Sequence, residues 1–172
     1  MQGIHHAGIV VSQLDRAIDF YVGVLGLEML SEPGPPNASP HLDTVLGLTG
    51  ARLRGVLLRA GSSAIELHEF YAPPWAGRGP VPANALGAQH VAFHTDDLAA
   101  EKAAIEARGG TFFTDINVID SGPFAGLRTA FIRDPDGVRI EFVEVAYWLT
   151  AEREAAIKEY RATRLREGGA ND

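Results

Sequence analysis

The sequence predicts an α+β fold of two tandem βαβββ modules, whose curved mixed sheets surround a cavity. The first observation is a segment near the N-terminus, IHHAGIVVSQLDRAIDFYVGVLGLEML, whose pattern returns in the second half as AQHVAFHTDDLAAEKAAIEARGGTFFT. The second is that further strand-like segments follow each copy. The third is a stretch rich in Pro, Gly and Ala between the copies. The expected boundaries are 1–72 and 88–147 for the modules, 73–87 for the linker and 148–172 for a C-terminal helix and tail.

One constant spacing aligns the two copies of the repeat. It carries His6 onto His90 and Leu14 onto Leu98. Each copy is predicted to form a short strand, a polar helix cap, a helix that ends at a glycine, and a second strand.

The ends of the two repeat helices are predicted from their polar residues and glycines. Ser12 followed by Asp15 resembles a capping box for the first helix, and Thr95 or Asp96 is expected to cap the second. Gly26 and Gly109 lie where a helix commonly ends with a residue in the left-handed conformation.

The later strands are predicted at 52–59 and 64–70 in the first module, and at 127–133 and 138–145 in the second. The tetrapeptide Asp-Pro-Asp-Gly at 134–137 is a strong hairpin signal, because Pro fixes φ and Gly tolerates positive φ. The Pro-rich segment 31–40 is expected to be a loop, and 41–48 a short helix that covers the site. The C-terminal segment is expected to be an exposed helix without a catalytic role.

Composition excludes several classes of function. The 172 residues carry a net charge of −7 and no basic run, which argues against a nucleic-acid partner and against an anionic membrane surface. There is no cysteine, so a metal site has to use His, Asp and Glu. The N-terminal segment lacks the features of a signal peptide, and no apolar run is long enough to span a membrane, so we expect a cytoplasmic protein.

Alternation along the strands predicts four metal ligands. Residues two apart in a strand share a face, which places one His of each first strand, and one Glu of each last strand, opposite the apolar positions. The candidate ligands are His6, Glu66, His90 and Glu141. Two imidazoles and two carboxylates suit one divalent ion, Zn, Ni, Co, Mn or Fe, with positions left for water or substrate.

A simpler interpretation applies to each residue alone. A single His is more often a hydrogen-bonded structural residue than a ligand, but four such residues at repeat-equivalent positions favour the metal site. His68 and His94 share faces with ligands. They are either substrate contacts or polar residues at the cavity edge.

These segments resemble the vicinal oxygen chelate superfamily, which includes glyoxalase I, methylmalonyl-CoA epimerase, extradiol dioxygenases and bleomycin-resistance proteins. The matching stretches are IHHAGIVVSQLDRAIDFYVGVLGLEML, AIEL, GAQHVAFHTDDL and DPDGVRIEFVE. Carried over position by position, the family's ligands fall on the same four residues, and this pattern is similar to glyoxalase I and methylmalonyl-CoA epimerase. The arginine that many glyoxalase I sequences use near the first strand is absent at Val10 and Val11.

The resemblance implies a metal-dependent epimerase or isomerase that moves a proton on the carbon next to a carbonyl, through a metal-stabilised enolate. Glu141 is the expected base and Glu66 its counterpart. The implied substrate is a small carbonyl compound: a 2-substituted acyl thioester, a keto-sugar or cyclitol ketone, or a 2-oxoaldehyde adduct. A homodimer is also implied, and the resemblance leaves open whether the four ligands come from one chain or from two swapped chains.

Three alternatives remain open. An extradiol-type Fe(II) dioxygenase needs two His and one Glu, so Glu66 would occupy a position required for substrate or O₂. A non-catalytic binding (resistance) protein is expected to have a mainly apolar pocket rather than four polar ligands. A fosfomycin-type transferase is expected to use only three ligands.

Overall fold

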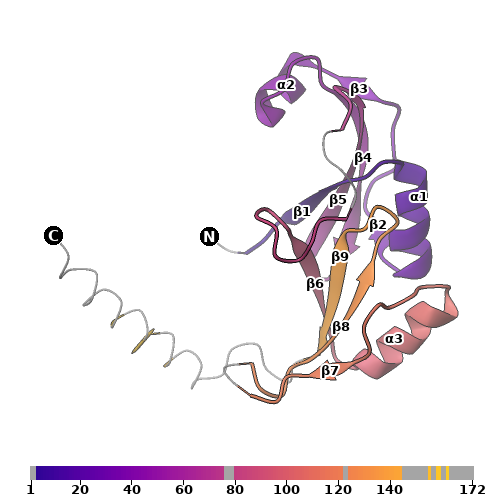
Figure 1. Ribbon diagram of the computed structural model, residues 1–172. Coiled ribbons are helices and arrows are strands. Elements are labelled where there is room, and N and C mark those ends of the chain that lie inside the picture. The colour runs from indigo at the N-terminus through magenta and orange to yellow at the C-terminus, as the bar shows by residue number, and fades with distance from the viewer. Residues whose placement is uncertain are drawn as a thin grey trace.

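The computed structural model describes residues 3–75, 80–121 and 124–144, together with positions 155, 158, 159 and 162. It shows two mixed β-sheets side by side, with helices α1 and α3 on one side of them (Figure 1). This arrangement confirms the predicted α+β fold of two βαβββ modules. The four described positions of the C-terminal segment are helical and exposed, and the rest of the expected C-terminal helix lies outside the described residues.

The first module forms a sheet of order β1-β5-β4-β2, and β3 also pairs with β4. Strands β1 and β5 are parallel and the other pairs are antiparallel. Its elements are β1 (His6–Val10), α1 (Leu14–Ile18), the π-helical turn η1 (Asp19–Val24), β2 (Glu28–Met29), β3 (Asn37–Ala38), α2 (Pro40–Leu46), β4 (Arg52–Ala60) and β5 (Ser63–Ala72).

The second module repeats this topology with the strand order β6-β9-β8-β7. Its first and last strands are again parallel neighbours. Its elements are β6 (His90–Thr95), α3 (Leu98–Ala107), β7 (Asn117–Val118), β8 (Arg128–Arg133) and β9 (Arg139–Glu144). The expected hairpins are therefore confirmed, and the ends of their strands differ from the predicted ends by at most two residues. The strand that follows the helix in each module, β2 or β7, is only two residues long.

One hydrophobic core joins the modules. Leu14 on α1 and Leu98 and Ile105 on α3 are fully buried, and the inward-facing residues of β4, β5, β8 and β9 are buried as well. Polar contacts also cross between the modules. The Tyr21 hydroxyl donates to Asp134 at 3.1 Å, and the Arg108 Nε donates to the carbonyl of Val24 at 2.7 Å.

The turn between β8 and β9 is held close to the linker. Gly137 has a φ of 88°, and a Cβ at this position would lie 2.4 Å from Cγ of Pro80. The expected hairpin is therefore confirmed. A glycine is needed at 137 because the backbone has a positive φ and because Pro80 approaches too closely for a side chain.

The predicted capping box at the first helix is wrong. Both the backbone N–H and the hydroxyl of Ser12 donate to Asp136 of the other module, at 2.8 and 2.7 Å, and Asp15 pairs with Arg54 instead. The helix N-terminus is satisfied from the neighbouring strand, because Glu69 accepts from the backbone N–H of Leu14 at 3.1 Å.

The second helix is capped in the same way. Glu144 accepts from the N–H of Leu98 at 2.7 Å, and Arg128 binds the same carboxylate. These hydrogen bonds lower the pKa of Glu144. The side-chain cap is Asp97, which accepts from Ala100 N–H at 2.9 Å, so the expectation of Thr95 or Asp96 is corrected by one or two residues.

The expected short helix after the Pro-rich loop is confirmed as α2. Ser39 caps it by accepting from the N–H of Leu42 at 3.1 Å, Pro40 occupies its first turn, and Gly47 ends it with a φ of 64°. Figure 1 shows α2 on the opposite side of the first sheet from α1. In the part of the chain that the structure describes, no helix has the length and apolar character needed to cross a membrane.

Candidate metal centre

The four candidate ligands lie on the sheet faces that the helices leave uncovered. In β5, Ile65 and Leu67 are buried in the core while Glu66 is partly exposed between them. In β9 the neighbours Ile140 and Phe142 are buried and Glu141 is partly exposed. The two histidines are half-exposed on the same faces, which confirms the face assignment made from alternation.

The first pair joins β1 to β5. Nε2 of His6 lies 3.2 Å from Oε2 of Glu66. The other ring nitrogen of His6, Nδ1, lies 2.8 Å from Nδ1 of His5. His5 therefore occupies the Nδ1 edge of the His6 ring and leaves Nε2 as the nitrogen directed at the carboxylate. A partner at the second ring nitrogen helps to orient an imidazole that binds a metal.

His68 contacts the other oxygen of Glu66. Its Nε2 lies 3.3 Å from Oε1, so the carboxylate is bracketed by two imidazoles. Gly55 is paired with His68 across β4 and β5, and a Cβ on Gly55 would lie 2.7 Å from Cδ2 of the His68 ring. The absence of a side chain at Gly55 is what lets the ring lie across the sheet.

The second pair joins β6 to β9. Nε2 of His90 lies 3.1 Å from Oε2 of Glu141. The hydroxyl of Thr129 on β8 donates to Oε1 of the same carboxylate at 2.6 Å. The ring of Phe131 packs against His90 with a centroid distance of 5.9 Å. Glu141 thereby has a partner on each oxygen, and His90 has an aromatic neighbour.

The two modules supply the second carboxylate contact from different strands. In the first module the residue two after the glutamate is His68, and Gly55 lies opposite it. In the second module the residue two after the glutamate is Val143, and Thr129 lies opposite it. The repeat therefore keeps a polar partner for Oε1 in both modules, although the polar residue has moved to the neighbouring strand.

The donor distances fit a shared cation within each pair. Two donors about 2.0–2.2 Å from one ion, at the angles of tetrahedral or octahedral coordination, lie roughly 3.0–3.4 Å apart. The observed separations are 3.2 and 3.1 Å. An imidazole nitrogen with a carboxylate oxygen is also a common ligand combination for Zn, Ni, Co, Mn and Fe.

The structure brings the expected ligands together as two pairs rather than as one set of four. Among the residues it describes, no three His, Cys, Asp or Glu side chains are grouped closely enough to hold a single ion. Each module of one chain therefore presents half of the predicted donor set.

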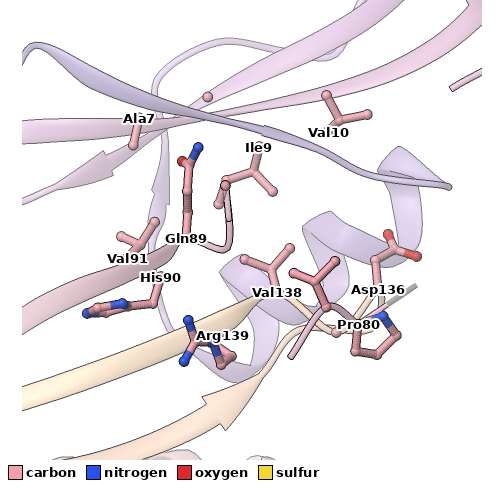
Figure 2. A pocket seen from close by; sticks show the side chains of 14 residues that line it. Ala7, Ile9, Val10, Pro80, Gln89, His90, Val91, Asp136, Val138 and Arg139 are labelled. Atoms are coloured by element: carbon pink, nitrogen blue, oxygen red, sulfur yellow. The ribbon is translucent and has the colours of Figure 1, made fainter. Parts of the chain in front are cut away.

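We call each pair, His6–Glu66 or His90–Glu141, a half-site. Each half-site opens onto a cavity. Glu66 and His68 line one of about 400 Å³, covered by the loop before α2 and by Leu42. His90 lines a second of about 330 Å³, between β1 and the start of β6 and β9 (Figure 2). His90 also borders a third, of about 750 Å³, together with His94, which is exposed on the same face of β6.

Three neighbours of the site carried no role in the sequence analysis. Thr129 was missed because its contact with Glu141 depends on which strands pair. His5 precedes the first residue of β1, so strand alternation does not fix its direction. Arg139 shares a face of β9 with Glu141, and it lines the cavity beside His90.

Comparison with known proteins shows the superfamily to which the chain belongs. Residues 3–142 match the family model described as the Glyoxalase/Bleomycin resistance protein/Dioxygenase superfamily, and the chain belongs to that superfamily. The resemblance seen in the sequence is thereby confirmed.

The relatives point to epimerases and lyases. The chain is 28% identical to a 2-epi-5-epi-valiolone epimerase from Actinomyces sp, over 92% of this chain and 87% of that protein. It is 33% identical to a lactoylglutathione lyase from Haemophilus influenzae, over 82% of this chain and 91% of that protein. A solved glyoxalase family protein from Bacillus cereus aligns with a TM-score of 0.67 at 26% identity, covering 84% of this chain and 94% of that one. These relatives support an enzyme of the epimerase or lyase type.

Proposed function

We propose that this protein is a metal-dependent epimerase or isomerase that moves a proton on the carbon next to a carbonyl group. The observation that carries the proposal is the repeated pair, in which an imidazole Nε2 and a carboxylate oxygen lie 3.2 Å apart in one module and 3.1 Å apart in the other. The names of the relatives, an epimerase and lactoylglutathione lyases, are consistent with this chemistry.

His6, Glu66, His90 and Glu141 are the residues that would hold the ion. A divalent cation bound there would polarise the carbonyl oxygen of a substrate and stabilise the negative charge that develops when the neighbouring carbon loses its proton. Zn, Ni, Co, Mn and Fe all fit this donor set.

Glu141 is the proposed base. Its side chain is 15% exposed, against 34% for Glu66, and its Oε1 accepts a hydrogen bond of 2.6 Å from the Thr129 hydroxyl. A carboxylate held in one orientation is suited to taking a proton from carbon. Glu66, in the equivalent position of the other module, is the proposed group that returns a proton to the opposite face of the carbon, with His68 against its second oxygen.

We further propose that two copies of the chain complete the centre, each supplying one pair. The alternative of four ligands within one chain is less well supported, because the described residues of one chain bring the candidate ligands together as two pairs, and no three of them are grouped so that they could hold one ion. The substrate class is a small carbonyl compound: an acyl thioester, a keto-sugar or cyclitol ketone, or a 2-oxoaldehyde adduct.

Solvent isotope exchange tests this function directly. Protein loaded with each candidate metal is incubated in D₂O with a panel of 2-substituted carbonyl compounds, and the α-proton signal is followed by NMR. We expect loss of that signal for at least one class, abolished by chelator. Glu141→Gln should slow exchange about 10²- to 10⁴-fold.

Glu144→Gln is the matched control for this experiment. Glu144 lies three residues further along β9 and caps α3, so its amide should leave exchange intact while lowering stability. Exchange that persists in the chelated protein, or in Glu141→Gln at the wild-type rate, would contradict the proposed function.

A further inference from the structure

Arg139 is the one described arginine without a partner. Arg16, Arg54, Arg59 and Arg128 each bind a carboxylate, Arg108 and Arg133 donate to backbone carbonyls, and Arg52 lies over the Tyr71 ring at 5.3 Å. Among the residues that the structure describes, no hydrogen bond, ion pair or ring contact is made by Arg139. The residue is nevertheless partly buried.

This arginine lies beside the second half-site. Arg139 is in register with His90 across the parallel pair β6–β9, and residues paired in this way point to the same face. It is two residues before Glu141 on that face. Figure 2 shows Arg139 next to His90 on one wall of the cavity of about 330 Å³, with Gln89 extending from the same wall toward β1.

The fold does not favour an arginine at this position. Arg139 lies directly opposite Arg133 in the antiparallel pair β8–β9, and like charges opposite one another destabilise a sheet. The acidic residue that lines this cavity, Asp136, is already bound by the backbone N–H and hydroxyl of Ser12 and by Arg16. Among the described residues, the positive charge of Arg139 therefore has no counter-ion, and it is available to a group that enters the cavity.

From these contacts we infer that Arg139 binds an anionic group of the substrate, a carboxylate or a phosphate, next to the His90–Glu141 pair. This inference rests on the proposed function for the reacting carbonyl, and it narrows the substrate class to carbonyl compounds that carry a negative charge. A guanidinium binds both anions through two parallel hydrogen bonds, which also fixes the orientation of the group.

Two matched pairs of probes test the charge preference. Pyruvate is compared with pyruvamide, and dihydroxyacetone phosphate with dihydroxyacetone, by calorimetric titration of the full-length, metal-loaded protein. We expect at least one anion to bind more tightly than its neutral counterpart, and the pair that shows the preference identifies a carboxylate or a phosphate. Equal binding of anion and neutral compound in both pairs overturns the inference.

Three variants assign the preference to Arg139. Arg139→Met should weaken binding of the preferred anion roughly tenfold or more, and Arg139→Lys should lose less. Arg133→Met removes the same charge one strand away and should leave binding unchanged. Arg139→Met should also melt no lower than the wild type, because it removes the like-charge pair.

Two other outcomes overturn the inference. Equal losses in Arg139→Met and Arg133→Met would show a general charge effect. Dissociation of Arg139→Met dimers without weaker anion binding would show that Arg139 pairs with a second copy of the chain. Anion binding is measured without turnover, so the two proposals can fail separately. A protein that binds anions at Arg139 but exchanges no proton would contradict the proposed function, and the assignment of Arg139 would still hold.

Discussion

At the scale of single residues, the site depends on what holds each carboxylate still. Glu66 and Glu141 each have one oxygen near an imidazole and the other near a polar neighbour, His68 or Thr129. Such outer partners determine how well a ligand is oriented, and their loss commonly weakens metal binding.

Replacing Thr129 tests this role. Thr129→Val keeps the shape of the side chain and removes the donor to Glu141, so metal affinity should fall about 10- to 100-fold, while Thr129→Ser should retain it. Competition with a chromophoric chelator measures the affinity. A Thr129→Val protein that binds metal as tightly as the wild type would show that the 2.6 Å hydrogen bond has no part in the site.

Among the elements, α1 and α3 are capped at their N-termini in the same way. A glutamate three residues beyond each proposed ligand, Glu69 or Glu144, accepts from the first N–H of the helix and is bound by an arginine of the adjacent strand. The last strand of each module, β5 or β9, thus carries a proposed ligand on one face and the glutamate that caps a helix on the other. The position of each helix is therefore linked to that of its proposed ligand.

The β8–β9 turn is the element that docks the second module onto η1. Asp134 at its start is buried, and it accepts from the N–H of Val138 at 2.7 Å, the N–H of Asp136 at 2.9 Å and the Tyr21 hydroxyl at 3.1 Å. Burial raises the pKa of Asp134 more than these hydrogen bonds lower it. Burial, with Asp134 nearby, also raises the pKa of Tyr21.

This shift predicts a pH dependence of stability. Because the folded pKa of Asp134 exceeds the unfolded one, its contribution is fully present below the unfolded pKa and is lost as pH rises through the folded pKa. Asp134→Asn is neutral at every pH, and its oxygen and amide can serve the same partners. The free energy of unfolding of the wild type should therefore fall relative to Asp134→Asn as pH rises from about 3 to about 7. Urea unfolding measures the difference, and parallel curves would argue against the shift.

At the scale of the whole molecule, one shared core fixes the modules against each other while the ligand pairs stay on the uncovered faces. Tyr21 and the inward-facing residues of both sheets are buried together. The described residues of one chain then offer two pairs, and a second copy related by two-fold symmetry can bring a pair from each chain to each of two identical centres.

Complementation distinguishes shared from single-chain centres. His6→Ala and His90→Ala should each be inactive alone. The two variants are mixed in equal amounts, unfolded and refolded together, so that about half of the dimers contain one chain of each variant. Each mixed dimer has one intact centre and one that lacks both histidines. About one quarter of the wild-type exchange activity should therefore return. No recovery in a mixture shown to contain mixed dimers would place all four ligands within one chain.

The order of the elements, the hairpins and the strand faces that carry the candidate ligands could be predicted from local patterns. These patterns are the repeat, the Asp-Pro-Asp-Gly turn and the period-two alternation, and the folded chain keeps them. Three features could be seen only in the folded chain: Ser12 binds Asp136 rather than capping its own helix, Thr129 donates to Glu141, and Arg139 has no partner among the described residues. These contacts join residues that are far apart in the chain or on neighbouring strands, so they depend on strand register and on module packing, which no local pattern encodes.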